Sequence, residues 1–364
     1  MQIAIDVRML GHSGIGTYIR NIIPLCIKMM PDYDFLLIGG KKDKQKLCEA
    51  PNVSHKYVNA GIYSLKEQLA LPGAVHQADA LWVPHYNIPL FTRIPLIVTV
   101  HDLAHLTLPE ITGNKVKLLY AKTMLQAVKR KARLILTVSD FSRNEFINKA
   151  GLPKGRLNVV YNGVDESWFN LSPQASPFPY PYFTAIGNVK NHKRIKMLCR
   201  AFAQVAEKIP QHLLVIGKNS GFLSGGESIE ALKGLQPDKI HFTGELDFSG
   251  LQNYMANSCG LIFPSAYEGF GLPPLEALAA GVPVLASDIA VMQELYKDNI
   301  KFFACDNRQS LARAIIDFSK LSDEERKTIK NAGIGKAKQF SWRQAACLTV
   351  AAIRQCFPLQ NINR

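Results

Sequence analysis

The feature that most constrains this fold is a repeated alternation of short apolar segments with segments of helical periodicity. Buried strands show the first pattern and amphipathic helices the second. In the first half we expect strands at Ile3–Val7, Phe35–Ile38, Ala80–Val83, Leu96–Val100, Leu134–Val138 and Leu157–Val160. Helices are expected at Ile15–Met30, Lys115–Lys131 and Asp140–Ala150. This alternation predicts an α/β fold in which parallel sheets are covered by helices.

The alternation restarts in the second half of the chain. Strands are expected at Tyr182–Ile186, Leu213–Ile216, Lys239–Phe242, Gly260–Phe263 and Val282–Ala286. Helices are expected at Lys193–Glu207 and near Pro274–Ala280, and the last part of the chain is expected to be entirely helical. Two separate sets of alternating elements indicate two α/β domains.

The length of 364 residues also suits two domains better than one core. The pattern changes at Asn162–Asp165, and the four prolines of Ser172–Pro181 make that segment the best candidate linker. We expect an N-terminal domain over 1–165, a second domain over 166–340, and a C-terminal helix within 341–364 that packs back on the first. A cleft is expected where the carboxyl ends of both sheets meet, because ligands bind there.

Composition excludes several classes of protein. Apolar residues make up 47% and charged residues 20%, and no apolar run is long enough to span a membrane. Charges near the N-terminus, at Asp6 and Arg8, interrupt the apolar stretch that a signal peptide needs, which favours a cytoplasmic protein. The seven cysteines are scattered and form no Cys-x-x-Cys pair, so neither a disulfide framework nor a zinc site is expected.

A glycine-rich loop follows the first expected strand and opens a helix. Its glycines, Gly11, Gly14 and Gly16, let a backbone approach a ligand whose phosphate faces the helix N-terminus. A tight turn without a ligand is the alternative. Ile19 stands where the third glycine of a dinucleotide-binding fingerprint belongs, which weakens a hydride-transfer interpretation.

The most specific segment, Pro264–Val284, begins where the strand Gly260–Phe263 ends. Gly269 and Gly271 free the loop to wrap an anion, and the following prolines favour a helix start whose dipole holds negative charge. Glu268 and Glu276 are placed so that both carboxylates can point into one pocket. Carboxylates accept hydrogen bonds from paired hydroxyls such as those of a ribose or a hexose.

This segment closely resembles the signature of the family 4 glycosyltransferases, in which two glutamates are separated by seven residues. The resemblance extends over nearly the whole chain through Asp6–Arg8, Val100–Leu103, Val138–Arg143 and Asn162–Asp165. It implies the GT-B architecture, in which two Rossmann-like, doubly wound parallel-sheet domains face a central cleft. It also implies retaining transfer of a sugar from a nucleotide diphosphate donor to an acceptor, with closure of the domains excluding water.

The resemblance assigns roles to residues of the second domain. Glu276 would hold the donor ribose, Glu268 would face the transferred sugar, and Lys193 would neutralise the diphosphate as its charge grows. The full set of expected donor-binding residues comprises Gly14, Gly16, Asn188, Lys193, Gly269, Phe270, Gly271, Leu272 and Glu276. Asn188 departs from the family, where an arginine is common, so a second cation must come from Lys190, Arg194 or elsewhere. Lys190 and Arg194 can equally be solvated charges.

In the first domain, His101 follows the strand Leu96–Val100. The resemblance places a histidine of this kind beside the sugar, so His101 joins Glu268 and Lys193 as a predicted catalytic residue. A structural cap is the alternative. His85, Ser139 and Arg143 are weaker candidates on the acceptor side.

No metal and no other cofactor is expected. The one Asp-x-Asp triplet, Asp32–Asp34, precedes a strand and follows a proline, which favours a surface turn. Lys193 and a helix N-terminus would neutralise the diphosphate in place of magnesium. No base stands out among the side chains, so the leaving phosphate is expected to take the acceptor's proton.

The formal charge of +14 favours anionic partners without naming one. Seven lysines and arginines and no acid lie between Lys115 and Arg133, so this helix either rests on an anionic membrane or packs on the core with a solvated face. A nucleic-acid-binding protein would interleave aromatic residues with the charges, and only Tyr120 does so here. A nucleotide-sugar epimerase of the same architecture is the rival enzyme.

The nucleotide base, the sugar and the acceptor, whether a glycan or a lipid-linked saccharide, stay open. The sequences of the segments Gly14–Tyr18 and Lys190–Lys193 most resemble those of bacterial polysaccharide mannosyltransferases of the lipopolysaccharide type. This resemblance would imply GDP-mannose as the donor.

Overall fold

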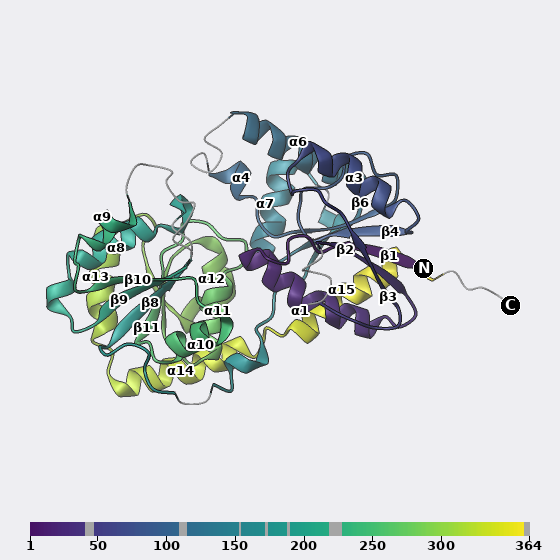
Figure 1. Ribbon diagram of the computed structural model, residues 1–364. Helices are drawn as coiled ribbons and strands as arrows, with labels where there is room; N and C mark the ends of the chain where they lie inside the picture. The colour runs from purple at the N-terminus through teal and green to yellow at the C-terminus, as the bar shows by residue number, and fades with distance from the viewer. Residues whose placement is uncertain are drawn as a thin grey trace. The chain divides into compact units, whose positions relative to one another are not determined.

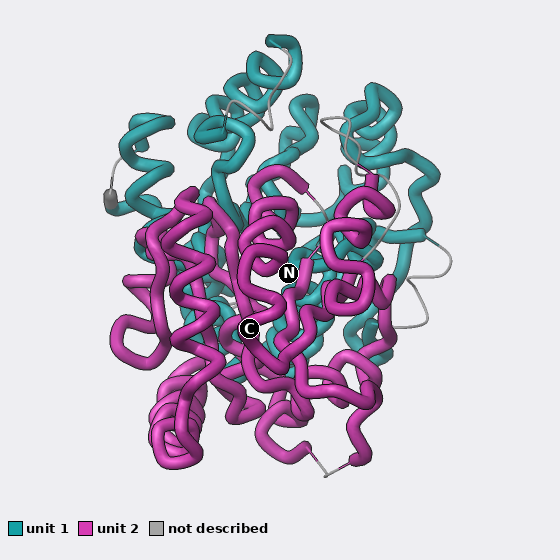
Figure 2. Tube along the Cα trace, turned by 90° about the vertical axis from the view of Figure 1, so that its left-hand side faces the viewer, with its two compact units in different colours: residues 1–163, 341–364 teal, residues 164–340 magenta. Residues whose placement is uncertain are grey.

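A computed structural model describes residues 1–40, 47–108, 115–152, 154–171, 174–187, 190–217 and 228–359. The chain forms two compact units (Figure 2), which are residues 1–163 with 341–364, and residues 164–340. The predicted Asn188 lies outside the described residues. Among the described helices, none is both long and apolar enough to cross a bilayer.

Unit 1 is built around a parallel sheet. Its strands are β1 (Gln2–Asp6), β2 (Asp34–Gly39), β3 (Val53–Tyr57), β4 (Ala80–Val83), β5 (Leu96–Val100), β6 (Ala132–Thr137) and β7 (Leu157–Val159). They are ordered β3-β2-β1-β4-β5-β6-β7. Its helices are α1 (Ser13–Met29), α3 (Leu65–Val75), α4 (Ala104–Thr107), α6 (Lys115–Lys131), α7 (Asp140–Ala150) and α15 (Trp342–Cys356) (Figure 1).

Unit 2 repeats this plan with six parallel strands. They are β8 (Tyr182–Ile186), β9 (His212–Ile216), β10 (Ile240–Gly244), β11 (Gly260–Phe263), β12 (Val284–Ser287) and β13 (Lys301–Phe303), in the order β10-β9-β8-β11-β12-β13. The helices are α8 (Ile195–Ala203), α9 (Ile229–Lys233), α10 (Phe248–Ala256), α11 (Leu272–Ala279), α12 (Ala290–Tyr296), α13 (Arg308–Ser319) and α14 (Asp323–Ala337). The predicted pair of doubly wound parallel sheets is confirmed.

The strand order fixes where ligands can bind. In each sheet the order reverses direction between two neighbouring strands, β1 and β4 in unit 1 and β8 and β11 in unit 2. Such a switch point leaves a crevice at the carboxyl ends of the two strands. The switch point of unit 1 therefore brings together the loops that follow Asp6 and Val83, and that of unit 2 the loops that follow Ile186 and Phe263.

Helix α15 completes unit 1 although it follows the whole of unit 2 in sequence. It packs along α1 (Figure 1), where the ring of Tyr18 meets that of Trp342 edge-on with centroids 6.1 Å apart. The Tyr33 hydroxyl donates a hydrogen bond to the Phe357 carbonyl at 2.7 Å. This packing covers the apolar face of α1.

The proline-rich segment 172–181 is not a linker between the units, which corrects the expectation. The chain passes from unit 1 to unit 2 between Gly163 and Val164, so this segment lies inside unit 2. Between its prolines stand aromatic residues that pack on unit 2: Phe178 contacts the ring of Tyr182, and Tyr180 stacks on His212 at 4.5 Å. The prolines disfavour a regular helix or strand in this segment, but its aromatic side chains still pack on unit 2.

Candidate functional site

The switch point of unit 2 brings Lys193 and Glu268 into contact. Lys193 lies in a single 3₁₀ turn, Asn191–Lys193, after β8, and Glu268 lies in the loop after β11. The lysine Nζ is 2.5 Å from Glu268 Oε1, and it also stands 5.7 Å from the centre of the Phe263 ring. The two side chains are 23% and 14% exposed, so this ion pair stays accessible to solvent and to a ligand.

The predicted helix Lys193–Glu207 is interrupted at its start. Arg194 adopts a left-handed conformation with φ of 52°, and α8 begins only at Ile195. The Arg194 guanidinium donates to both carboxylate oxygens of Asp306 and to the Asn191 carbonyl. These contacts tie Arg194 to the fold, which leaves Lys190, an exposed residue, as the better of the two candidates for a second cation.

The glycine loop that leads into α11 is shaped by its neighbours. Gly271 has a φ of +92°, and a Cβ at this position would lie 2.5 Å from Met292 Cε. Both the backbone conformation and the lack of space therefore disfavour a side chain. The Tyr296 hydroxyl donates to the Gly271 carbonyl at 3.1 Å and holds the turn in place. Phe270 is buried against Phe340, with ring centres 5.8 Å apart, so only its backbone is available to a ligand.

Two prolines limit what the N-terminus of α11 offers an anion. Pro273 and Pro274 occupy its first turn and carry no amide hydrogen. Because the Leu275 amide makes the first intrahelical hydrogen bond, to the Gly271 carbonyl, the amide donors left there are those of Gly271 and Leu272. A diphosphate at this place would depend on the glycine loop more than on the helix.

Glu276 lies at the start of the second turn of α11. Burial, with a smaller contribution from the negative charge of Asp165, raises the pKa of Glu276 to about 7. Among the described residues none forms an ion pair with it. A carboxylate in this condition gains from hydroxyl groups that donate to it, such as those of a ribose.

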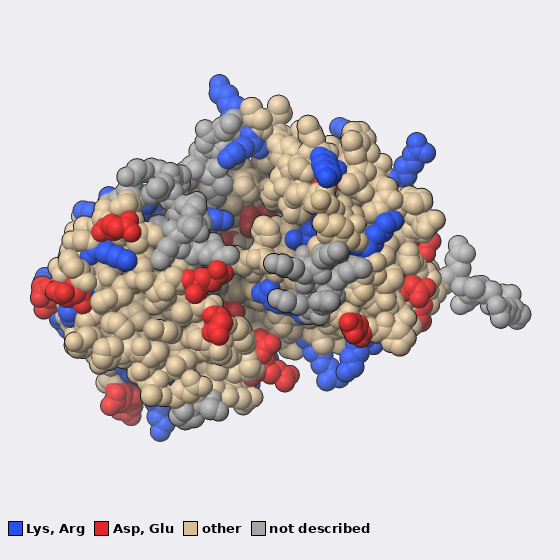
Figure 3. Space-filling view, in the orientation of Figure 1, with Lys and Arg blue, Asp and Glu red and all other residues tan. Residues whose placement is uncertain are grey.

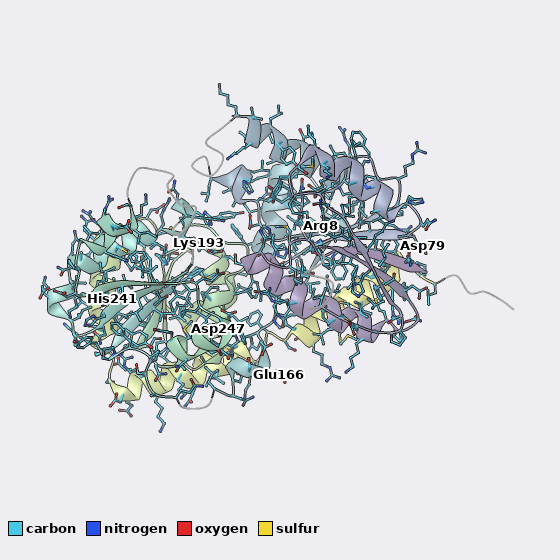
Figure 4. The ribbon with its side chains drawn as sticks, in the orientation of Figure 1. Arg8, Asp79, Glu166, Lys193, His241 and Asp247 are labelled. Atoms are coloured by element: carbon cyan, nitrogen blue, oxygen red, sulfur yellow. The ribbon has the colours of Figure 1, made fainter. Side chains whose placement is uncertain are left out.

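The switch point of unit 1 holds a buried polar network that sequence analysis did not assign. Arg8, labelled in Figure 4, donates through Nε to Asp6 at 2.8 Å and through Nη2 to Glu67 at 2.6 Å. Asn87 Nδ2 donates to Glu67 at 2.8 Å, and the Tyr120 hydroxyl donates to Asn87 Oδ1. The network thus runs from the core strand β1 to the surface helix α6.

The charges of this network stabilise one another. Burial alone would raise the pKa of Asp6, but the hydrogen bonds that Arg8 donates, together with the electrostatic effect of the nearby His85, hold this pKa well below its usual range. The Asp6, Glu67 and Arg8 side chains are at most 5% exposed. A signal for Glu67 existed in the sequence, since it stands three residues after the helix cap Ser64, the spacing of a capping box.

His85 is buried within the same region and cannot itself contact an acceptor. Its Nδ1 accepts a hydrogen bond from the Asn87 amide at 3.2 Å, which places the proton of a neutral ring on Nε2. Nε2 is 3.6 Å from Asp6 and has no hydrogen-bond partner among the described residues. Any effect of His85 on an acceptor would be indirect.

His101 follows β5, as expected, and is tightly held. Its Nε2 donates to the Pro84 carbonyl at 2.9 Å, and the Tyr18 ring packs edge-on at 4.9 Å. Burial lowers the pKa of His101 to about 4 despite the opposing effect of the Pro84 carbonyl. At neutral pH this imidazole is uncharged, with Nδ1 as its hydrogen-bond acceptor.

The two remaining acceptor-side candidates have structural roles. Ser139 is buried and caps α7, its hydroxyl accepting from the Ser142 amide at 3.0 Å. Arg143 pairs with Asp140 at 2.7 Å and is 37% exposed. Asp32 of the Asp-x-Asp triplet pairs with Arg354 of α15 at 2.7 Å, which occupies it on the surface.

The two glycines at the start of α1, Gly14 and Gly16, have different surroundings. A Cβ on Gly16 would lie 2.3 Å from the Leu10 carbonyl oxygen, so this glycine allows the helix to approach the preceding loop. A Cβ on Gly14 would meet no heavy atom within 4 Å. Gly16 is therefore explained by packing, and Gly14 keeps its predicted role near a ligand.

Two family models match consecutive parts of the chain. Glycosyltransferase Family 4 matches residues 64–168, and Glycosyl transferases group 1 matches residues 168–334, which include Lys193, Glu268 and Glu276. Together they extend over most of both units.

Curated relatives and solved structures agree with these models. The chain is 28% identical to the O-antigen chain mannosyltransferase RfbU of Salmonella typhimurium, over 66% of this chain and 64% of the relative. It is 29% identical to the O-antigen chain mannosyltransferase B of Escherichia coli, over 71% of this chain and 70% of the relative. The matches thus span about two thirds of these relatives.

Similar folds are found among solved glycosyltransferase structures. Anabaena HepE in complex with UDP-glucose aligns with a TM-score of 0.76 at 19% identity, over 98% of this chain and 99% of that one. A glycosyltransferase from Rickettsia africae aligns with a TM-score of 0.73 at 17% identity, over 98% of each chain. The fold is the GT-B architecture of these enzymes. The chain is a glycosyltransferase, a sugar-transferring enzyme, whose first part matches the Family 4 model and whose second part matches the group 1 model.

Proposed function

We propose that this protein is a retaining, metal-independent hexosyltransferase that uses a nucleotide diphosphate sugar. The observation that carries the proposal is the switch point of unit 2, where Lys193 pairs with Glu268 beside the glycine loop that leads to Glu276 in α11. A cation for the diphosphate, one carboxylate for the sugar and one for the ribose are the groups that such a donor requires.

The ion pair suggests how the donor binds. Lys193 Nζ contacts Glu268 Oε1 at 2.5 Å. A diphosphate carries more negative charge than one carboxylate and would take over Lys193, which releases Glu268 to accept hydrogen bonds from the sugar hydroxyls. The same two residues would then change partners together when the donor binds.

In the transfer step, the acceptor hydroxyl attacks the anomeric carbon while the bond from that carbon to the diphosphate breaks. The acceptor's proton passes to the leaving phosphate oxygen, and Lys193 stabilises the negative charge that develops there. Neutral His101 at the carboxyl edge of unit 1 would orient hydroxyl groups through hydrogen bonds. No metal is assigned a role, and the protein's own cation serves the diphosphate.

The relatives' names guide the choice of sugar and acceptor. The two relatives named above are O-antigen chain mannosyltransferases, so we propose mannose from GDP-mannose as the donor. The acceptor would be a glycan or lipid-linked saccharide in bacterial polysaccharide synthesis, reached from the cytoplasmic side of the membrane.

The test is a thermal titration with GDP, UDP and ADP in the presence of EDTA. A ligand that binds only the folded state raises the melting temperature. One nucleotide should stabilise the wild type and fail to stabilise Glu276→Ala, whereas Glu207→Ala, an exposed glutamate of unit 2, should respond like the wild type. If no nucleotide stabilises the wild type, with or without magnesium, the proposal is wrong. If magnesium is required, its metal-independent part is wrong.

A further inference from the structure

Unit 1 carries an apolar surface that its own core does not use. Several large apolar side chains of α3, of the loop after β4 and of α6 are mostly solvent-exposed. They are Tyr63 (49%), Leu65 (89%), Leu69 (72%), Phe91 (67%), Val116 (71%) and Leu119 (66%). We call these six residues the apolar patch.

Contacts at both ends join the three elements into one surface. At one end the ring of Tyr63 meets that of Tyr120 edge-on, with centres 6.4 Å apart, which links α3 to α6. At the other end Gln68 accepts a hydrogen bond from the Leu90 amide, and Lys131 donates to the Leu90 carbonyl. The loop that carries Phe91 is thereby fixed between the two helices.

Positive charge surrounds this patch without exposed acid. Apart from Lys131 and Arg133, which contact the Leu90 carbonyl and the Phe357 ring, six exposed cations belong to the same three segments: Lys66, Arg93, Lys115, Lys117, Lys122 and Arg130. Within residues 63–73, 84–95 and 115–133 the only acid is Glu67, which is buried in the Arg8 network. In Figure 3 basic side chains stand out along the upper part of unit 1, where Figure 1 places α6.

We propose that the apolar patch and its six cations bind the surface of an anionic bilayer. Exposed apolar side chains framed by lysine and arginine are the features that interfacial binding requires: the apolar groups enter the boundary of the acyl chains and the cations meet the headgroups. An acidic protein partner would complement the cations, but its charged surface would leave the exposed leucines of α3 without an apolar surface to contact.

This inference rests on the proposed function and chooses between its two acceptors. Tyr63 belongs to the patch and its ring contacts that of Tyr120. The Tyr63 backbone amide donates to Glu67 and the Tyr120 hydroxyl donates to Asn87, so both residues join the network of unit 1. A saccharide attached to a lipid of the same bilayer would reach unit 1 beside these hydroxyl groups. A lipid-linked acceptor is therefore favoured over a free glycan.

The experiment is vesicle flotation of the full chain, with phosphatidylcholine alone and with added phosphatidylglycerol. The wild type should float with the anionic vesicles only, and less at high salt because the cations are screened. Leu65→Glu with Leu69→Glu should reduce flotation roughly tenfold. Leu348→Glu, at a leucine of α15 that is 48% exposed, is the matched control and should float like the wild type.

The charges are tested separately with Lys117→Glu and Lys122→Glu, against Lys327→Glu on α14 as the control. Nucleotide-induced stabilisation should be unchanged in every variant, which shows that each is folded and keeps the failure of this inference distinct from failure of the proposed function. Absence of flotation, equal flotation with neutral vesicles, or wild-type flotation of the double leucine variant would overturn the inference. So would a wild-type dimer that the leucine substitutions convert to a monomer, since the patch would then bind a second copy.

Discussion

The two switch points of this molecule hold their acids in different ways. In unit 1, Asp6 and Glu67 share one arginine, and all three side chains are almost completely buried. In unit 2, Glu268 pairs with a lysine that is 23% exposed, and Glu276 has no cation among the described residues. One site has satisfied its charges internally, and the other keeps charged groups that a ligand can still engage.

The difference teaches where ligand charge is expected. A network that is already paired and dry gives a rigid scaffold and gains little from an added anion. Accessible or unfavourably buried charges are less stable on their own and gain more when a partner arrives. The comparison therefore supports the proposal that unit 2 makes the ionic contacts of the donor, with the acids of unit 1 in a positioning role.

The largest effect is expected from breaking the network of unit 1. Arg8→Ala leaves two buried carboxylates without their cation, which should lower the free energy of unfolding by about 3–5 kcal/mol. Arg354→Ala removes a surface arginine–aspartate pair of similar length in the same unit and should cost at most about 1 kcal/mol. Denaturant titration measures both. Equal losses would mean that burial does not distinguish the Arg8 network.

The next effect should have the opposite sign. The native pKa of Glu276, about 7, exceeds its usual 4.5, so between these values the native state retains a proton that the unfolded state has released. Stability therefore falls as pH rises from 4.5 to 7, and Glu276→Gln should be more stable than the wild type at pH 8 by up to about 3 kcal/mol.

The gain in Glu276→Gln should vanish near pH 4, where both states of the wild type are protonated. Denaturant titrations at pH 4 and pH 8 check this, with Glu207→Gln as the exposed control. A variant less stable than the wild type at pH 8 would show that Glu276 is a stabilising residue and that the contrast between the two switch points fails.

The smallest change in stability is expected at Lys193. Because its pair with Glu268 is partly exposed, Lys193→Ala should alter the free energy of unfolding by no more than about 1 kcal/mol. Its affinity for a nucleoside diphosphate should nevertheless fall at least about tenfold, since a charge-assisted contact is lost, while affinity for the nucleoside stays unchanged. Calorimetric titration measures the affinities for the nucleoside diphosphate and for the nucleoside separately, with Lys190→Ala for comparison. An equal loss for the nucleoside would exclude a specific diphosphate contact.

Much of the fold followed from the sequence because central strands are buried on both faces. The bounds of β4, β5, β8 and β11 agree with the predicted segments, since a continuous apolar run has one interpretation there. The edge strand β3 was missed because most of its residues are exposed. Helix α3 was missed because Pro72 stands inside it, next to a glycine.

The sequence allowed us to predict which segments carry the site, but not which of their side chains contact one another. The run from Glu268 to Glu276 carries its own local signature, so its place at the end of a strand could be inferred. The pairing of Lys193 with Glu268 depends on β8 lying beside β11, an order that no local pattern encodes. The partners of Arg8 are likewise distant in sequence, Glu67 by 59 positions. These assignments remain predictions for mutagenesis.

The return of α15 to unit 1 has a consequence for synthesis of the protein. On the ribosome, residues 164–340 emerge before the helix that covers α1, so unit 2 can fold while unit 1 still lacks its last layer. During that interval the side chains of α1 that contact α15, among them Tyr18, Cys26 and Met29, lack that partner. The domain whose synthesis starts first is thus finished last, and it spends translation of the whole second domain with a face that other nascent chains or chaperones can bind.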